Sequence, residues 1–268
     1  MAFFVAADGC RIHYETFGAK GPRLVLIPGL GGDGRFWSGV VRLLEADYRL
    51  IVIDHRGAGR SDRPDGPYSV PLIAGDVAGL LAQTGGPAHI AGHSTGGAIA
   101  QRLALDHADL GLSYTISSSW ARADTRFRTV FTARAELLEA GMAETYQRLT
   151  HVLCHEASYL AMHAAELEAA VATASRTLAP LNVAASRLRM LLDHDCLDDL
   201  AGIAVPVQVI AATGDVLTPP ELTQAIAAAI PGARYASVDG AHFHPLARPE
   251  GIAAVIHRFI TEAEQQTS

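Results

Sequence analysis

Short apolar runs alternate with segments of helical periodicity along much of this chain. Apolar runs at 24–27, 50–53 and 89–91 are each followed by a helix-like segment, at 36–44, 70–83 and 97–107 respectively. Because the runs are apolar at successive positions, both faces of each predicted strand must be covered. This pattern is typical of an α/β fold in which a mostly parallel sheet carries helices on both faces.

The first residues follow a different pattern. Phe3 to Ala6 and Arg11 to Thr16 favour strands, and the turn pair Asp8-Gly9 stands between them. We therefore predict an antiparallel hairpin at one edge of the sheet.

The alternation is interrupted in the second half of the chain. It stops after an apolar run at 113–117 and returns at 207–211, which one further run and a last helix follow. Residues 120–200 are instead rich in Ala, Leu, Glu and Arg at helical spacing. The sequence predicts a core with an eight-stranded sheet, formed by residues 1–119 and 201–268, and a helical cap at 120–200. A cap over the carboxyl ends of parallel strands would influence substrate choice, because such sheets bind ligands there.

Composition narrows the classes of partner. The chain has 268 residues, a formal net charge of −7 and a single lysine, Lys20. No basic stripe is available to neutralise a phosphate backbone, so we expect no nucleic-acid partner. Cys10, Cys154 and Cys196 lie far apart without a CxxC spacing, which favours reduced thiols over a disulfide framework or a zinc site.

The sequence also favours a cytoplasmic protein that does not enter a membrane. The apolar start at 3–7 is short and ends at Asp8-Gly9, unlike a signal peptide. No other apolar run approaches the roughly 18 to 20 residues that span a bilayer. We expect a small-molecule substrate as the partner, and the sequence leaves the oligomeric state open, with a homodimer as one arrangement.

A serine between glycines follows one of the predicted strands. The segment Gly92-His93-Ser94-Thr95-Gly96-Gly97 stands between the apolar run that ends at Ala91 and a helical segment. This is the context of a nucleophile elbow, in which glycines keep side chains away from a serine on a sharp turn and the helix start presents N–H groups to a developing anion. We predict Ser94 as the nucleophile, against the alternative of an ordinary glycine-rich turn.

Serine needs a base, and His242 is the best candidate. It follows the apolar stretch 235–238 in the loop Asp239-Gly240-Ala241-His242. His244 is the main rival, although its neighbour Pro245 suggests a packing role in the loop. His93 is adjacent to the serine and is expected to pack in the core.

The base in turn needs a carboxylate that fixes its tautomer. Asp215 follows the run 207–211, and the chain order Ser94, Asp215, His242 is the order expected for this kind of elbow. Asp124, just after the strand before the cap, is the alternative, whereas Asp239 is expected to serve its own turn.

Two backbone N–H groups are candidates for an oxyanion hole. Ile27-Pro28-Gly29-Leu30-Gly31-Gly32 follows an early strand, and its glycines allow a close approach to a ligand. We predict that the N–H groups of Leu30 and Thr95 stabilise the oxyanion. The glycine-rich segment 54–61 lacks the third glycine and the helix start of a dinucleotide site, so we expect a structural turn there.

The cap carries two further groups of candidate residues. His151 and His155 share a helix face, but no third ligand accompanies them, which favours a packed or solvated face over a metal site. Four arginines crowd the start of the cap: Arg122, Arg126, Arg128 and Arg134. Such a run is usually solvated, but an arginine in the pocket would favour a carboxylate-bearing substrate, and we predict Arg122 and Arg126 for this role.

Taken together, these motifs resemble the α/β-hydrolase superfamily over nearly the whole chain. Within it the sequence is similar to the group of 3-oxoadipate enol-lactonases and aminoacrylate hydrolases, including a cap opening at Trp120-Ala121-Arg122, so Trp120 joins the predicted substrate-binding residues. Pro28-Gly29 stands where this group usually has His-Gly, which keeps the backbone donor. The resemblance implies a covalent acyl mechanism without a cofactor or a metal ion.

Three functions are compatible with these residues. The first is hydrolysis of a small ester, a lactone or a similarly activated acyl compound by a serine hydrolase. The second is hydrolysis of a carbon–carbon bond in a diketone-like or vinylogous acid, which can use the same side chains. The third is a ligand receptor that retains these side chains but turns over slowly.

Overall fold

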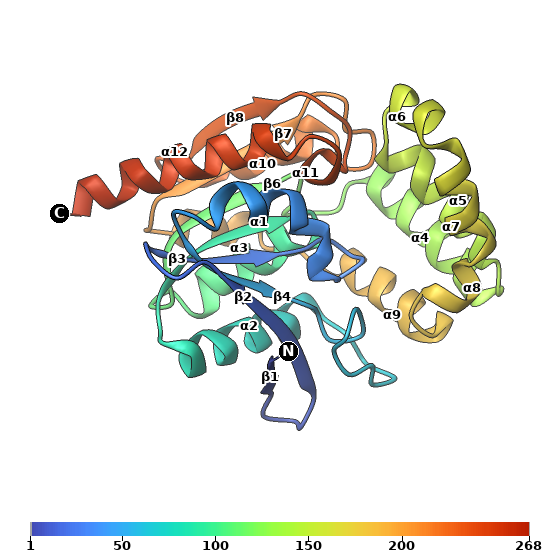
Figure 1. Cartoon of the computed structure of the whole chain (residues 1–268), viewed down its shortest axis with the longest axis horizontal. Helices are drawn as coiled ribbons and strands as arrows, with labels where there is room; N and C mark the ends of the chain where they lie inside the picture. Colours follow the sequence, from blue (N-terminus) through green and yellow to red (C-terminus); the bar gives the residue numbers. More distant parts are fainter. Residues whose placement is uncertain (1, 268) are drawn as a thin grey trace.

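The computed structural model describes residues 2–267 and confirms the α/β fold (Figure 1). Among these residues, eight strands form one sheet in the order β1-β2-β4-β3-β5-β6-β7-β8. The strands are β1 (Ala2–Val5), β2 (Arg11–Phe17), β3 (Arg23–Ile27), β4 (Arg49–Ile53), β5 (Ala88–His93), β6 (Gly111–Ser117), β7 (Val207–Ala212) and β8 (Arg234–Val238).

The predicted hairpin forms the antiparallel edge of this sheet. β1 pairs with β2 and β2 pairs with β4 in antiparallel register, whereas the other neighbouring strands are parallel. Gly9 turns the chain between β1 and β2 at a φ of 87°, and its N–H donates to the carbonyl oxygen of Ala6 at 2.8 Å. Glycine adopts this positive φ without a steric cost, which explains the Asp8-Gly9 turn.

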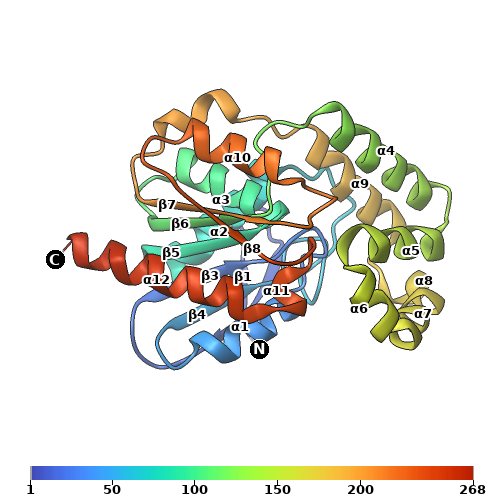
Figure 2. The same ribbon diagram turned by 90° about the horizontal axis from the view of Figure 1, so that it is seen from above.

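Helices cover both faces of the sheet, as Figure 2 shows. One face carries η1 (Gly34–Trp37), α1 (Ser38–Leu44), α11 (His244–Ala247) and α12 (Pro249–Thr267), and the other carries α2 (Val70–Thr84), α3 (Thr95–Asp106) and α10 (Pro220–Ala229). Alternate residues of β3 explain the two layers. Leu24 and Leu26 join the apolar cluster under α1 and α12, whereas Val25 and Ile27 join the cluster under α2 and α3. Successive strand residues point to opposite faces, so an apolar run fills both clusters.

A helical insertion lies between β6 and β7. It contains α4 (Thr125–Glu139), α5 (Ala143–Cys154), α6 (Ala157–Met162), α7 (Ala164–Ala172), α8 (Ala174–Thr177), α9 (Leu181–Leu192) and η2 (Leu197–Gly202). Helices α4 to α9 gather at one end of the sheet in both views (Figures 1 and 2). The division of the chain into two domains, a core and a cap at residues 120–200, remains a prediction.

Within residues 2–267, no helix combines the length and the apolar character that crossing a bilayer requires.

Candidate active site

Ser94 occupies a sharp turn between β5 and α3. Its φ of 55° and ψ of −117° lie in a region that residues other than glycine rarely adopt. The glycines on either side are required by packing. A Cβ atom on Gly92 would lie 2.1 Å from the Gly96 carbonyl oxygen, and one on Gly96 would lie 2.1 Å from the Ile27 carbonyl oxygen. The local geometry is therefore that of the elbow predicted from the sequence.

Two short contacts connect Ser94, His242 and Asp215. His242 Nε2 lies 3.0 Å from Ser94 Oγ, and His242 Nδ1 lies 2.7 Å from Asp215 Oδ2. All three side chains are buried, since Ser94 is 5% exposed, His242 2% and Asp215 4%. The structure thus brings together three residues that are far apart in the sequence, in an arrangement that can pass a proton from the hydroxyl to the imidazole.

Asp215 is held by donors from its own loop. Its Oδ1 accepts hydrogen bonds from the backbone N–H groups of Leu217, at 2.9 Å, and Thr218, at 2.8 Å. The Thr218 hydroxyl lies 2.8 Å from Asp215 Oδ2 and 3.1 Å from His242 Nδ1. Burial opposes ionisation of the carboxyl group, but His242 and these hydrogen bonds hold its pKa below the usual value. The ionised carboxylate accepts the Nδ1 hydrogen of His242, which leaves Nε2 to accept a proton. Sequence reasoning missed Thr218, although its place three residues after Asp215 suits a local hydrogen bond.

The rival residues face other partners. His244 Nε2 lies 3.1 Å from Ser117 Oγ, and burial lowers the pKa of His244 to about 3. His93 is fully buried and stacks on Phe36 with ring centroids 5.0 Å apart, as its predicted core role requires. Asp124 caps α4, where its Oδ1 accepts the N–H of Phe127 at 2.7 Å. The geometry therefore favours His242 and Asp215 over His244 and Asp124.

A cavity of about 280 Å³ opens in front of Ser94 and His242. Core residues form one side of it: Pro28, Gly29, Leu30, Gly31, Gly32, Asp33, Phe36, Leu217 and Phe243. Residues of the insertion form the other side: Phe131, Arg134, Tyr146, Gln147, Thr150, Cys154 and Leu178. Residues of the insertion therefore line the same cavity as the nucleophile.

Comparison with known proteins identifies the family. Residues 24–255 match the alpha/beta hydrolase family. The chain belongs to this family. A RutD protein of Azorhizobium caulinodans, named as a candidate carbamate hydrolase, is 35% identical over 256 residues, which cover 95% of this chain and 96% of the relative. Several RutD proteins of Caulobacter strains are 30% to 31% identical.

Solved structures with the same fold include an enol-lactonase from Burkholderia xenovorans LB400. Its TM-score is 0.88 at 27% identity, covering 97% of this chain and 100% of the lactonase. An esterase from Thermogutta terrifontis aligns with a TM-score of 0.85 at 24% identity over 98% of both chains, which supports the fold alone. The resemblance to the α/β-hydrolase superfamily inferred from the motifs is confirmed.

Three residues predicted to bind substrate in this α/β hydrolase do not line the cavity of Ser94. Trp120 is fully buried and packs against Phe127 with ring centroids 4.5 Å apart. Arg122 is exposed, and its guanidinium group contacts Asp195 and Asp198, each at 2.8 Å. Arg126 donates to the carbonyl oxygen of Val216 at 2.7 Å. Both arginines lie near the start of α4, where nearby carboxylates and carbonyl groups occupy them, so the structure does not bring them to the site.

Arg134 is the arginine of α4 that reaches the cavity. Its side chain is 3% exposed, and its Nη2 donates to Tyr146 Oη at 3.2 Å and to Thr150 Oγ1 at 3.0 Å. The sequence contained a signal for this placement. Phe127, Phe131 and Leu138 form the buried stripe of α4, and Arg134 lies on the same stripe at helical spacing.

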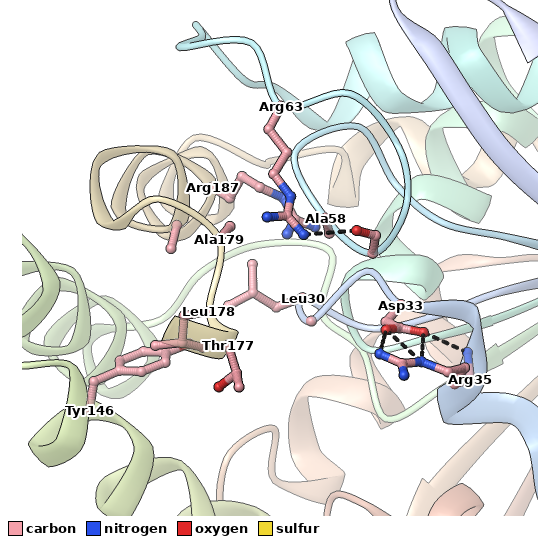
Figure 3. Close-up of a pocket in the computed structure, with 13 residues that line it drawn as sticks. Leu30, Asp33, Arg35, Ala58, Arg63, Tyr146, Thr177, Leu178, Ala179 and Arg187 are labelled. Carbon is pink, nitrogen blue, oxygen red and sulfur yellow. Dashed lines mark hydrogen bonds and ion pairs between the residues drawn. The ribbon is translucent and has the colours of Figure 1, made fainter. Parts of the chain in front are cut away.

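A second cavity of about 170 Å³ adjoins the first, because Leu30, Gly31, Asp33, Tyr146 and Leu178 line both. Figure 3 shows Arg187, from α9, reaching toward Arg63 and Ala58 in this space. Arg187 Nη2 lies 3.2 Å from His55 Nδ1, and burial lowers the pKa of Arg187 to about 10. Burial and Arg187 hold the pKa of His55 well below its usual value, so the neutral imidazole accepts this hydrogen bond.

Proposed function

We propose that this α/β hydrolase is a serine hydrolase that cleaves a small ester, a lactone or a similarly activated acyl substrate. The observation that carries the proposal is the pair of contacts from Ser94 through His242 to Asp215, at 3.0 and 2.7 Å. Because the cavity in front of Ser94 measures about 280 Å³ and has mostly apolar walls, it fits a small acyl compound.

In the first half of the proposed reaction, Ser94 Oγ attacks the substrate carbonyl carbon while His242 Nε2 accepts the hydroxyl proton. Asp215 orients the imidazole and stabilises the imidazolium that forms. The tetrahedral intermediate then loses its leaving group, which takes the proton from His242, and an acyl group remains on Ser94. In the second half, water attacks this ester with His242 again as the base, and the acid product and the free serine result.

The backbone N–H groups of Leu30 and Thr95 are proposed to stabilise the oxyanion. Thr95 is the first residue of α3, and Gly29, next to Leu30, lies against Ser94: a Cβ atom on Gly29 would be 3.4 Å from Ser94 Cβ. Neither N–H takes part in the loop hydrogen bonds found among residues 2–267. Each donor of an oxyanion hole typically contributes about 10² to 10³ in kcat.

The relatives support a reaction at an acyl carbon. The names carbamate hydrolase and enol-lactonase both describe attack on a carbonyl group bonded to a heteroatom. We therefore place esters, lactones and carbamates ahead of carbon–carbon bond cleavage as substrates, and product analysis on an ester and a diketone of similar size separates the two.

The decisive experiment replaces the nucleophile. Ser94→Ala should lower kcat by about 10⁴ to 10⁶ on any ester that the protein cleaves, because the three side chains act as a unit. With the native protein, mass spectrometry of a rapidly quenched reaction should detect the acyl group on the peptide that contains Ser94. Cys154 provides the comparison, since it is the thiol that lines the cavity and burial raises its pKa to about 12. Loss of activity in Cys154→Ser, with more than a tenth retained in Ser94→Ala, would contradict the proposal.

A further inference from the structure

Arg134 is a buried cation at the Ser94 cavity without a carboxylate partner. Among the ion pairs of the described residues, none includes Arg134, and its Nε is buried without a hydrogen-bond acceptor. Its guanidinium carbon lies 5.1 Å from the ring centroid of Phe131 and 5.0 Å from that of Tyr146. Two hydroxyl groups and two aromatic rings therefore surround this charge, but they compensate only part of the hydration that the guanidinium group loses on burial. A buried charge without a counter-ion is costly, so the site is incomplete without an anion.

The acidic groups near the cavity are already engaged. Asp33 is the one acidic residue among those that line the cavity in the described part of the chain, and its carboxylate pairs with Arg35. Asp215 lies behind His242, where the imidazole and Thr218 occupy its oxygens. No side chain at the cavity is therefore free to neutralise Arg134, and the missing negative charge has to come from a ligand.

We infer that Arg134 binds a carboxylate group of the substrate, so that the enzyme acts on acyl compounds that carry a second, anionic carboxyl group. This inference rests on the proposed function, because it assigns the other end of the substrate to Ser94. Arg134 comes from α4 in the insertion and Ser94 from the elbow in the core, and both line one cavity. A substrate across that cavity places its carboxylate at the guanidinium group and its reacting carbonyl at the serine. A guanidinium group suits this role because its planar donors match the two oxygens of a carboxylate.

The second cavity offers a competing position for the anion. Arg187 and Arg63 both line it (Figure 3). One difference favours Arg134: Ser94 lines the cavity of Arg134 and does not line that of Arg187. The experiment below distinguishes anion binding at Arg134 from anion binding at Arg187.

The test compares monomethyl glutarate with methyl valerate, two esters of similar length that differ in one carboxylate, by following methanol release. For the native protein we expect kcat/KM to be at least about tenfold higher for monomethyl glutarate, the scale of one charge-assisted hydrogen bond. Arg134→Met should remove this preference, mostly by raising the KM for monomethyl glutarate. Arg134→Lys should retain part of the preference. Arg128→Met is the matched control, since Arg128 lies on the exposed side of α4 and donates to the carbonyl oxygen of Leu192.

Two further measurements use folded protein without relying on Arg134→Met. Glutarate should inhibit methyl valerate hydrolysis by the native protein competitively, whereas 1,5-pentanediol should not. Calorimetry on Ser94→Ala should detect glutarate binding, at least about tenfold weaker when Arg134→Lys is added.

The outcomes separate this inference from the proposed function. Equal kcat/KM values for the two esters in the native protein, together with the expected loss in Ser94→Ala, would overturn the role of Arg134 alone. A preference that disappears in Arg187→Met and persists in Arg134→Met would move the anion to the second cavity and equally overturn it. Hydrolysis of neither ester would count against the proposed function, and glutarate binding by calorimetry would then decide the role of Arg134.

Discussion

The carboxylate of Asp215 is the residue-scale feature on which the proposed mechanism depends most. It is almost fully buried, which opposes its charge, and yet the His242 imidazole and the donors of its own loop lower its pKa. The same donors fix the position of the carboxylate, and the carboxylate in turn fixes the tautomer of His242. An amide in its place would keep the volume but would no longer require the hydrogen on Nδ1.

Asp215→Asn should therefore lower kcat by about 10³ to 10⁴ with little effect on folding, because the imidazole would adopt the wrong tautomer. Steady-state kinetics on one ester, with circular dichroism as a check of the fold, measures this. Asp124→Asn is the matched control. Asp124 caps α4, and asparagine is an equally good N-cap residue, so its kcat should stay within about a factor of three of the native value. A large loss in Asp124→Asn and a small one in Asp215→Asn would reverse the assignment of the acid.

At the residue scale, the sequence predicted that Asp215 and His242 lie beside Ser94, but it did not predict that Arg134 lines the cavity. Ser94, Asp215 and His242 each follow a predicted strand, and parallel strands bring their carboxyl ends to one edge of the sheet. The arginines depend instead on how α4 is rotated against the core. Nearness to the start of the insertion favoured Arg122 and Arg126, whereas the apolar stripe of α4 points to Arg134.

At the scale of elements, the elbow joins β3, β5 and α3 through backbone contacts that leave no room for side chains. Gly96 Cα faces the carbonyl oxygens of Ile27 and Pro28, so an added Cβ atom would lie 2.1 and 2.6 Å from them. Backbone atoms cannot rotate away as a flexible side chain can. The substitution must therefore displace α3 from the loop that carries Leu30.

Gly96→Ala should lower the free energy of unfolding by about 2 kcal/mol or more, the range seen for overpacked cores, and should also lower kcat. Urea unfolding followed by fluorescence measures the first effect. Gly75→Ala is the control, because Gly75 lies in the middle of α2 with nothing within 4 Å of an added Cβ atom. That variant should gain about 0.5 to 1 kcal/mol from helix propensity alone. Equal stability of the two variants would mean that the elbow tolerates a side chain.

The strands were more predictable than the helices of the insertion for a physical reason. A fully apolar run has to be a covered strand or a buried helix, and its length decides between them. Part of the insertion instead divides into α5, α6, α7 and α8, which are separated by only one or two residues. None of these helices has a side-chain N-cap hydrogen bond. Without cap residues the sequence carries no clear signal for where one helix ends and the next begins.

At the scale of the whole molecule, the site depends on how the insertion sits on the core. The backbone N–H of Phe243, next to His242, donates to the carbonyl oxygen of Cys154 in α5 at 2.9 Å. Arg248 and Glu156 form an ion pair at 2.7 Å between the same two regions. These contacts connect the loop of the proposed base to the helix that lines the cavity. The position of the insertion follows from such long-range contacts, which is why helical periodicity alone did not place its side chains.

Buried histidines give the whole molecule a predicted sensitivity to acid. Burial lowers the pKa of His194 to about 4 and that of His244 to about 3, and it holds those of His55 and His93 well below the usual value. In the unfolded chain these groups titrate near pH 6.5. Below that pH the unfolded chain takes up protons that the folded chain does not, so the free energy of unfolding falls as the pH falls toward about 4. Above about pH 7 these groups are neutral in both states and contribute no pH dependence.

Each of these four histidines should lower the free energy of unfolding by up to about 1.4 kcal/mol for each pH unit below pH 6.5. Over about two pH units, the four contributions together are comparable with the total stability of a typical protein. Urea unfolding at a series of pH values should therefore give a plateau from about pH 8 to pH 7 and a steep loss between about pH 6.5 and pH 5. His194→Gln should reduce the slope by about one proton, since it removes one buried imidazole that contacts Cys196 at 3.5 Å and leaves the elbow untouched. A free energy of unfolding that stays constant down to about pH 5 would mean that these imidazoles accept protons in the folded state, because only equal proton uptake by both states removes the slope.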